Sequence, residues 1–185
     1  FNDSLGRYNG TAQGGIVAGN AWGYFQDENA TYCDGTNDRI NISSKTNINQ
    51  TIPISIGLFM KSDTSSPAWG RVIYLGDAPG IMLNRNNLVN QIEVRIDTNY
   101  SGLQYNQKPC SFNNIFSNKW YNLVVTFNST TAICYTNGII DTSGNYLSGI
   151  GIIERSGIYC CGLIWNEPSS CLYPTPAIVF ILPSS

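Results

Sequence analysis

Residues 119–140, KWYNLVVTFNSTTAICYTNGII, constrain the fold more than any other segment of the chain. Over residues 121–127 every second residue is apolar, which is the period of a strand with one buried face. Polar residues interrupt this pattern, which resumes over residues 132–136. Asn137-Gly138 then supplies the two positive-φ positions of a type I′ hairpin turn. The segment therefore predicts an antiparallel meander.

The remaining strand-like runs are short and separated by turn residues, and no stretch shows the apolar spacing of an amphipathic helix. This pattern predicts an all-β sandwich, and 185 residues suffice for one hydrophobic core. The predicted strands are residues 15–17, 22–25, 39–42, 52–61, 71–75, 81–84, 91–97, 121–127, 132–136, 149–154, 162–165 and 177–182. The predicted turns are Asp34-Gly35, Gly76-Asp77, Pro79-Gly80 and Asn137-Gly138.

Both ends of the chain differ from this pattern. Residues 1–15 are rich in Gly and Asn and are predicted to form an N-terminal arm, which leaves residues 16–173 as the sandwich domain. Residues 174–185 contain an apolar run without alternation, which predicts a strand buried on both faces. This strand either lies inside its own sandwich or is donated to a neighbouring subunit. Its residues are Ala177, Ile178, Val179, Phe180, Ile181 and Leu182.

Composition excludes several classes of function. The formal net charge of −2 provides no basic field, which argues against nucleic acid and an anionic membrane as partners. The chain contains no histidine, which excludes a Ser-His-Asp triad, a Cys-His pair and a histidine-ligated metal site within it. No apolar run reaches the roughly 18 residues of a membrane-spanning helix. The residues from Phe1 onward do not resemble a signal peptide, so we expect any such peptide to have been removed.

The chain has six cysteines, an even number without a repeated zinc-ligand spacing, which favours disulfides and an oxidising compartment. The sequence leaves their connectivity open. A bridge from Cys160 or Cys161 to Cys171 is favoured, because a bond between adjacent cysteines would be strained. The alternative is buried free thiols in a cytosolic protein. The candidates are Cys33, Cys110, Cys134, Cys160, Cys161 and Cys171.

Seven Asn-x-Ser/Thr sequons support a secreted chain that carries N-glycans. Asn41 lies between Ile40 and Ile42, and strand alternation turns the two isoleucines inward and the asparagine outward. Asn128 lies in a predicted hairpin loop, so a glycan at either position would not disturb a core. The sequons begin at Asn2, Asn9, Asn29, Asn41, Asn49, Asn99 and Asn128.

Three segments resemble the laminin-G-like branch of the concanavalin A-like lectin/glucanase superfamily. They are YCDGTNDRINI at 32–42, PISIGLFMKSD at 53–63 and the meander at 119–140. They are similar to strands of the family that read F-D-G-x-N-D, fTiSaWvk and W-hydrophobic-hydrophobic-v-T-f followed by lYvNG. The resemblance covers roughly residues 22–166 and implies a jelly-roll sandwich of two antiparallel sheets, with an extra C-terminal strand. Such motifs are signatures of a fold and not of an activity.

Glucanases of this superfamily use two carboxylates about 5 to 5.5 Å apart. The nearest candidates are Glu93 and Asp97, which share a strand face. Four strand residues separate them by about 13 Å, and Arg95 lies between them. We therefore expect a charge cluster at this position and no enzyme activity.

The family also commonly binds calcium at the sandwich rim, through oxygen ligands from several loops. No Asp-x-Asp spacing concentrates such ligands in this chain, so we expect no cofactor, with Ca²⁺ at a loop rim as the alternative. The loop acids that could contribute are Asp63, Asp77 and Asp141.

A lectin site requires aromatic platforms close to amide donors and acceptors. Residues of both kinds occur in predicted loops, although core packing accounts equally well for many of the rings. The candidates are Trp69, Tyr100, Tyr105, Tyr146, Asn86, Asn87 and Asn106.

Together these observations favour a non-catalytic extracellular glycoprotein that acts as a structural or adhesive surface module. Only 12% of the residues are charged, the sequons are dense, and the last strand is apolar, which suits a subunit that buries its edges against copies of itself. We therefore predict a filament that assembles by exchange of the terminal strand. The alternatives are a carbohydrate-binding lectin and, less favoured, a glycosidase.

Overall fold

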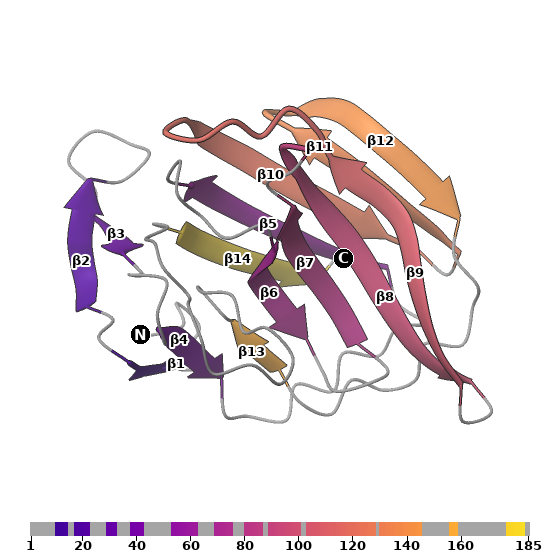
Figure 1. Ribbon diagram of the computed structural model, residues 1–185, viewed down its shortest axis with the longest axis horizontal. Coiled ribbons are helices and arrows are strands. Elements are labelled where there is room, and N and C mark those ends of the chain that lie inside the picture. Colours follow the sequence, from indigo (N-terminus) through magenta and orange to yellow (C-terminus); the bar gives the residue numbers. More distant parts are fainter. Residues whose placement is uncertain are drawn as a thin grey trace.

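The chain folds into a sandwich of two antiparallel sheets in the computed structural model (Figure 1). The first sheet contains, in spatial order, β1 (Gly10–Gln13), β4 (Arg39–Ile42), β13 (Ser156–Ile158), β6 (Trp69–Leu75), β7 (Gly80–Asn86), β8 (Gln91–Tyr100) and β9 (Leu103–Phe112). The second sheet contains, in spatial order, β12 (Ile139–Asn145), β11 (Thr131–Thr136), β10 (Trp120–Phe127), β5 (Ile54–Lys61), β14 (Ala177–Pro183), β3 (Asn29–Tyr32) and β2 (Val17–Trp22). The predicted all-β jelly-roll sandwich is confirmed.

The structure describes residues 10–14, 17–22, 29–32, 38–42, 53–62, 69–75, 80–86, 89–100, 103–128, 130–145, 156–158 and 177–183. The strands predicted at 149–154 and 162–165 lie outside these residues. So do Cys33, Cys160, Cys161 and Cys171, the sequons at Asn2, Asn9 and Asn49, and the turns at Asp34-Gly35 and Gly76-Asp77. Of the predicted turn Pro79-Gly80, only Gly80 is described, as the first residue of β7.

The core lies between the two sheets, and strand alternation explains why. Buried and half-buried residues alternate along the whole of β5 and β10, which pair from Ile54↔Phe127 to Lys61↔Trp120. Fully burying an aliphatic side chain contributes about 1.5–3 kcal/mol, so each of these strands supplies a large share of the stability. The largest fully buried side chains are Ile56, Leu58, Met60, Ile73, Ile81, Leu83, Ile92, Ile96, Phe112, Ile115 and Leu123.

The hairpin that joins β11 to β12 has the predicted type I′ turn. Thr136 pairs with Ile139, and between them Asn137 has a φ of 53° and Gly138 a φ of 81°. These two positive values match the right-handed twist of the flanking strands.

Several strands were not predicted, and most of them lie at a sheet edge or next to one. β1, β9 and β12 are edge strands, and β1 and β12 are largely exposed, so their residues show little apolar alternation. Pro109 interrupts β9, which an edge strand tolerates because one side of its backbone is not paired within a sheet. β1 also shortens the predicted N-terminal arm, since residues 10–13 pair with β4. β3 and β13 were missed as well, and β2 runs between the predicted strands 15–17 and 22–25 and shares one residue with each.

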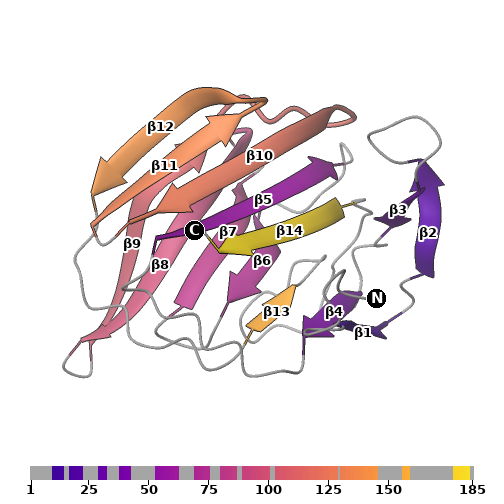
Figure 2. The same ribbon diagram turned by 180° about the vertical axis from the view of Figure 1, so that it is seen from behind.

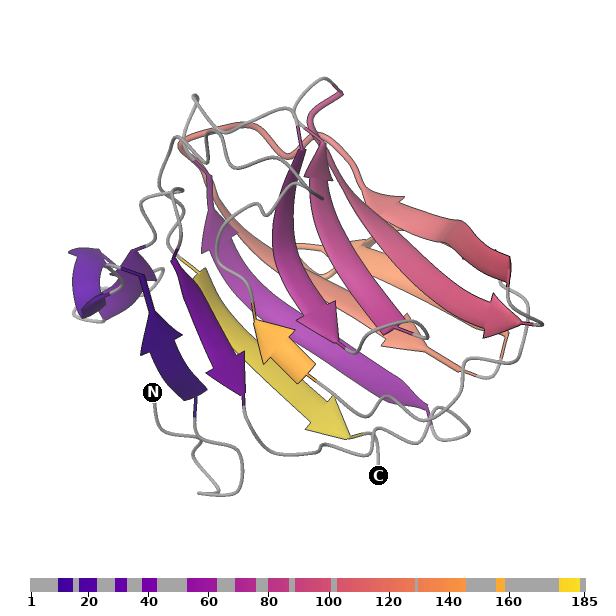
Figure 3. The ribbon, with the colours of Figure 1, turned by 60° about the horizontal axis from the view of Figure 1, so that its bottom comes forward.

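The apolar C-terminal strand lies inside the second sheet of its own chain. β14 pairs with β5 over seven residues, from Ala177↔Met60 to Pro183↔Ile54, and meets β3 at Thr31. Figure 2 shows it next to β5, and Figure 3 shows the same neighbours from another side. Of the two alternatives for this strand, the structure has the intramolecular one.

One side of the sandwich is closed where β9 lies against β12. A disulfide joins Cys110 of β9 to Cys134 of β11, with a Cα–Cα distance of 6.3 Å. The Thr142 hydroxyl accepts a hydrogen bond from the Ser111 amide at 2.8 Å and donates one to the Ser111 carbonyl at 2.6 Å. These links hold the two sheets together at this side.

Candidate functional site

The first sheet carries a row of polar side chains on the face that points away from the core. Ile92, Val94 and Ile96 of β8 face the core, so the alternate residues Glu93 and Arg95 lie on the opposite face. Pairing adds Asn84 beside Glu93 and Arg71 beside Asn84, while Asn86 and Lys108 contact the same carboxylate. We call this set the polar face. It consists of Arg71, Asn84, Asn86, Glu93, Arg95 and Lys108.

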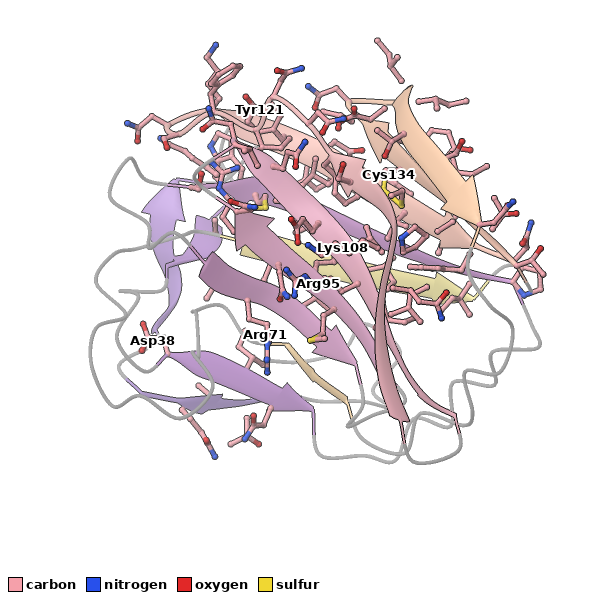
Figure 4. The ribbon with its side chains drawn as sticks, turned by 45° about the vertical axis from the view of Figure 1, so that its right-hand side comes forward. Asp38, Arg71, Arg95, Lys108, Tyr121 and Cys134 are labelled. Atoms are coloured by element: carbon pink, nitrogen blue, oxygen red, sulfur yellow. A yellow bond between two sulfur atoms is a disulfide. The ribbon has the colours of Figure 1, made fainter. Side chains whose placement is uncertain are left out.

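Glu93 is the centre of the polar face and is only 8% exposed. Arg95 donates to its Oε2 from Nε at 2.9 Å and from Nη2 at 2.7 Å, and the Lys108 ammonium lies 3.1 Å from the same oxygen. Asn86 Nδ2 donates to Oε1 at 3.2 Å. Figure 4 shows Arg95 and Lys108 next to each other over the sheet, with Arg71 farther along it. Glu93 therefore orders the side chains around it.

These contacts set the ionisation of Glu93. Burial on its own would raise the pKa of this carboxyl, but hydrogen bonds from Arg95, Asn86 and Lys108 and the Arg95 charge lower the pKa below its usual value. A general acid requires the opposite shift. The second predicted carboxylate, Asp97, lies four residues farther along β8, opposite Gly80 and Asn106.

Asn84 carries an acceptor atom without a partner on the same face. Its Oδ1 atom is buried and has no hydrogen-bond partner within the described residues. Leaving a buried carbonyl oxygen without a partner costs about 1–3 kcal/mol, so a hydroxyl or amide donor that displaced the atoms covering Oδ1 would be held well. The polar face thus combines donors from Arg71, Arg95 and Lys108 with an acceptor at Asn84.

The structure brings together two of the predicted lectin residues and separates the others. Trp69 pairs with Asn86, which places both positions at the polar face. The backbones of Tyr100, Tyr105 and Asn106 lie at the far end of the β8–β9 hairpin. Asn87 and Tyr146 lie outside the described part of the chain.

The sequence did not reveal Arg71, Asn84 and Lys108 as site residues. Alternation through Leu83 and Arg85 could have placed Asn84 and Asn86 on one face. Lys108 carried no such signal, because β9 was not predicted as a strand.

Asp141, one of the three predicted calcium ligands, is engaged in hydrogen bonds. Its Oδ2 accepts from the Asn113 amide at 2.7 Å and from the Thr136 hydroxyl at 2.9 Å, and its Oδ1 accepts from Asn113 Nδ2 at 2.9 Å. Asp63 and Asp77 lie outside the described residues. In the described ranges no three His, Cys, Asp or Glu side chains are grouped to hold a metal ion. The same ranges hold no helix that is long and apolar enough to cross a membrane.

Two sequons have described side chains, and their surroundings differ. Asn128 is exposed in the β10–β11 loop, where its Oδ1 accepts from the Thr130 amide at 3.0 Å and the Thr131 amide at 2.7 Å. Asn41 is half-buried in β4, with Thr11 of β1 on one side and Gly157 of β13 on the other. For Asn29 and Asn99, the structure establishes only their positions in β3 and β8.

Comparison with solved structures finds the same fold in binding domains of low sequence identity. The receptor-binding domain of botulinum neurotoxin C/D mosaic serotype aligns with a TM-score of 0.70 and 16% identity, over 98% of this chain and 45% of that one. The binding domain of Paraclostridial Mosquitocidal Protein 1 aligns with a TM-score of 0.71 and 15% identity, over 97% and 45%. The chain therefore spans less than half the length of these two domains.

A third similar structure is of nearly the same size. Domain 4 of AbnA, a GH43 extracellular arabinanase from Geobacillus stearothermophilus, was solved in complex with arabinotriose. It aligns with a TM-score of 0.65 and 16% identity, over 95% of this chain and 85% of that one. The search of curated proteins finds no match.

A laminin G family model matches residues 34–162, which is most of the chain and contains β4 to β12 as well as β13. The match agrees with the sandwich topology and with the three segments that carry the resemblance. The chain belongs to the concanavalin A-like lectin/glucanases superfamily.

Proposed function

We propose that this protein is a non-catalytic extracellular binding module that recognises a saccharide on the polar face. The observation that carries the proposal is the buried Asn84 Oδ1 atom, which lacks a partner among the described residues and lies beside ordered cationic and amide donors. Saccharide hydroxyls both donate and accept hydrogen bonds, so they match this mixture of groups. The arabinotriose complex of a domain with the same fold supports this choice of ligand.

We propose a binding function and not catalysis because of the state of Glu93. Its lowered pKa keeps it ionised, and three donors already occupy its two oxygens. About 13 Å of strand separates it from Asp97 along the backbone, too far for the pair of carboxylates that cleaves glycosidic bonds. Turnover of a glycoside by the wild-type protein that is lost in Glu93→Gln would contradict this part of the proposal.

A glycan array followed by calorimetry tests the saccharide site. We expect saturable binding of at least one glycan, weakened about tenfold or more by Asn84→Ala and by Arg71→Ala. The matched control is Asn122→Ala, a half-buried asparagine of β10 in the second sheet, which should retain wild-type affinity. Absence of binding across the array, or equal affinity in Asn84→Ala and the wild type, would refute the polar face as a saccharide site.

An extracellular location is part of the proposal. The Cys110–Cys134 disulfide supports it, because disulfides persist in oxidising compartments. Assembly into a filament is the finer alternative for the function. It has less support, because β14 already pairs with β5 in its own chain and exchange would require that pairing to open.

A further inference from the structure

One end of the sandwich carries all four exposed large apolar side chains in the described part of the chain. They are Val89 (53% exposed), Phe116 (46%), Ile139 (73%) and Ile140 (61%). Val89 lies in the β7–β8 connection, Phe116 in the β9–β10 connection and the isoleucines in the β11–β12 hairpin. We call these four residues the apolar rim. Clusters of exposed apolar side chains commonly mark a binding surface.

Hydrogen bonds join the three connections into one structure. The Ile115 amide donates to the Asn90 carbonyl at 2.8 Å, which ties the Phe116 connection to that of Val89. Asn113 donates to Asp141, which ties the same connection to the hairpin. Tyr121, labelled at the top of Figure 4, accepts from the Phe116 amide at 3.0 Å and donates to the Asn114 carbonyl at 3.2 Å. The rim is therefore held in place before it meets a partner.

The rim residues lie in or directly beside tight turns, and Ile139 and Ile140 begin β12. In the described residues every non-glycine residue with positive φ belongs to these connections, namely Asn90, Asn114, Asn118 and Asn137. Each of these asparagines lies within two residues of a residue of the apolar rim. A partner of the rim must therefore accept separate apolar tips with amide groups between them, as the boundary between headgroups and acyl chains of a bilayer does.

The whole chain has a formal net charge of −2, but the exposed charge in the described part of this end is a cation, Lys119. The Lys119 ammonium lies 5.7 Å from the centre of the Phe116 ring, and Lys61 pairs with Trp120 at the start of β10. The carboxylate of Asp141 accepts three hydrogen bonds from its own chain. Lys119 is exposed, and no exposed acid lies beside it in the described part of this end. This charge is complementary to an anionic surface.

We propose that the apolar rim inserts into the interface of a lipid bilayer that carries anionic headgroups. Ile139, Ile140, Phe116 and Val89 enter the boundary of the acyl chains, where apolar burial drives binding. Trp120, half-buried one residue after Lys119, is the kind of aromatic residue that anchors proteins at the membrane–water interface. Lys61 and Lys119 contact the headgroups. The polar face is a different surface, so this inference does not depend on the saccharide site.

Vesicle sedimentation tests the proposal with phosphatidylcholine vesicles prepared with and without phosphatidylserine. The wild-type protein should sediment with the vesicles that contain phosphatidylserine and bind much more weakly to phosphatidylcholine alone. Ile139→Ser with Ile140→Ser should lower the binding constant about tenfold or more, and Phe116→Ser should lower it as well. Lys119→Gln should lower it about fivefold, only where anionic lipid is present.

Two control variants separate this site from other surfaces. Ile133→Thr changes a half-buried residue of β11 away from the rim, and Asn84→Ala changes the polar face; both should bind vesicles like the wild type. Failure to sediment with either vesicle, or equal binding by the double isoleucine variant, would overturn the proposal. A wild-type dimer in sedimentation velocity that the same double variant abolishes would also overturn it, because the rim would then contact a second copy.

Discussion

Glu93 shows how a carboxylate is retained in a nearly buried position on a sheet face. Its pKa in the folded protein lies below the unfolded value of about 4.3. The ionised form therefore stabilises the fold above that pH, and this stabilisation is lost as the pH falls through the folded pKa. We predict that Glu93→Gln lowers the stability at pH 7 by about 1–3 kcal/mol. It should also flatten the fall of Tm below about pH 4, as measured by circular dichroism.

Lys119→Gln provides the control for charge loss, because Lys119 contacts an aromatic ring and not a carboxylate. Its Tm should depend on pH as that of the wild type does. If Glu93→Gln shows the same acid dependence as the wild type, the contacts of Glu93 contribute nothing to folding.

Two glycines of the β11–β12 region are required for different reasons. A Cβ atom at Gly144 would clash with the carbonyl oxygen of Pro109 and would lie 3.0 Å from its carbonyl carbon, so β9 or β12 would have to shift. At Gly138 nothing lies within 4 Å, but φ is +81°. We predict that Gly144→Ala costs about 1–3 kcal/mol or more by urea unfolding, and that Gly138→Ala costs about 1–2 kcal/mol. Wild-type stability of Gly144→Ala would show that the strands separate easily.

Asn128 and Asn41 allow a comparison between two sequons in one protein. On secretion from a eukaryotic cell we expect Asn128 to carry an N-glycan in most molecules, because its side chain is exposed in a loop. Asn41 is half-buried between two strands and should be modified much less. Mass spectrometry of glycopeptides measures both occupancies, and Asn128→Gln should remove the mass of one glycan. A higher occupancy at Asn41 would contradict the argument from exposure.

At the scale of elements, β14 decides whether the second sheet is complete. It pairs with β5 over seven residues, and without it the β5 backbone would present an open edge. We predict that deletion of residues 177–185 yields a protein that aggregates or unfolds. Addition of a peptide of residues 177–183 should restore the near-ultraviolet circular dichroism of the fold.

The intact protein provides the control for the deletion experiment. It should remain monodisperse in sedimentation velocity at concentrations where a filament would form. Filaments of the intact chain, seen by electron microscopy and abolished by the deletion, would favour the donated strand. A deleted chain that folds as a stable monomer would contradict the contribution that we assign to β14.

Position at a sheet edge also explains why most of the unpredicted strands could not be recognised in the sequence. β5 and β10 alternate because one of their faces is buried, and that alternation can be read from the sequence. β1 and β12 bury little and contain several polar residues, so nothing local separates them from loops. Their extended conformation depends on pairing with β4 and β11.

The whole molecule depends on the link between its two sheets, and the Cys110–Cys134 disulfide is one such link within the core. It closes a loop with a sequence separation of 24, for which loop entropy predicts a stabilisation of about 3 kcal/mol. We predict that replacing both cysteines with alanine lowers the midpoint of urea unfolding accordingly. In the wild type, a reducing agent that opens this disulfide should lower the midpoint by a similar amount. An unchanged midpoint would show that packing alone holds the sheets together.

The sequence by itself determined the sandwich, the meander at 119–140, its type I′ turn and the family, because these depend on local periodicity and turn chemistry. It also identified Glu93 and Arg95 as a charge cluster, since their spacing places them on one strand face. The tertiary structure decided which strands form the edges, where β14 lies and which side chains surround Glu93. Asn86 and Lys108 reach that carboxylate from β7 and β9, and only the pairing of three strands brings them together.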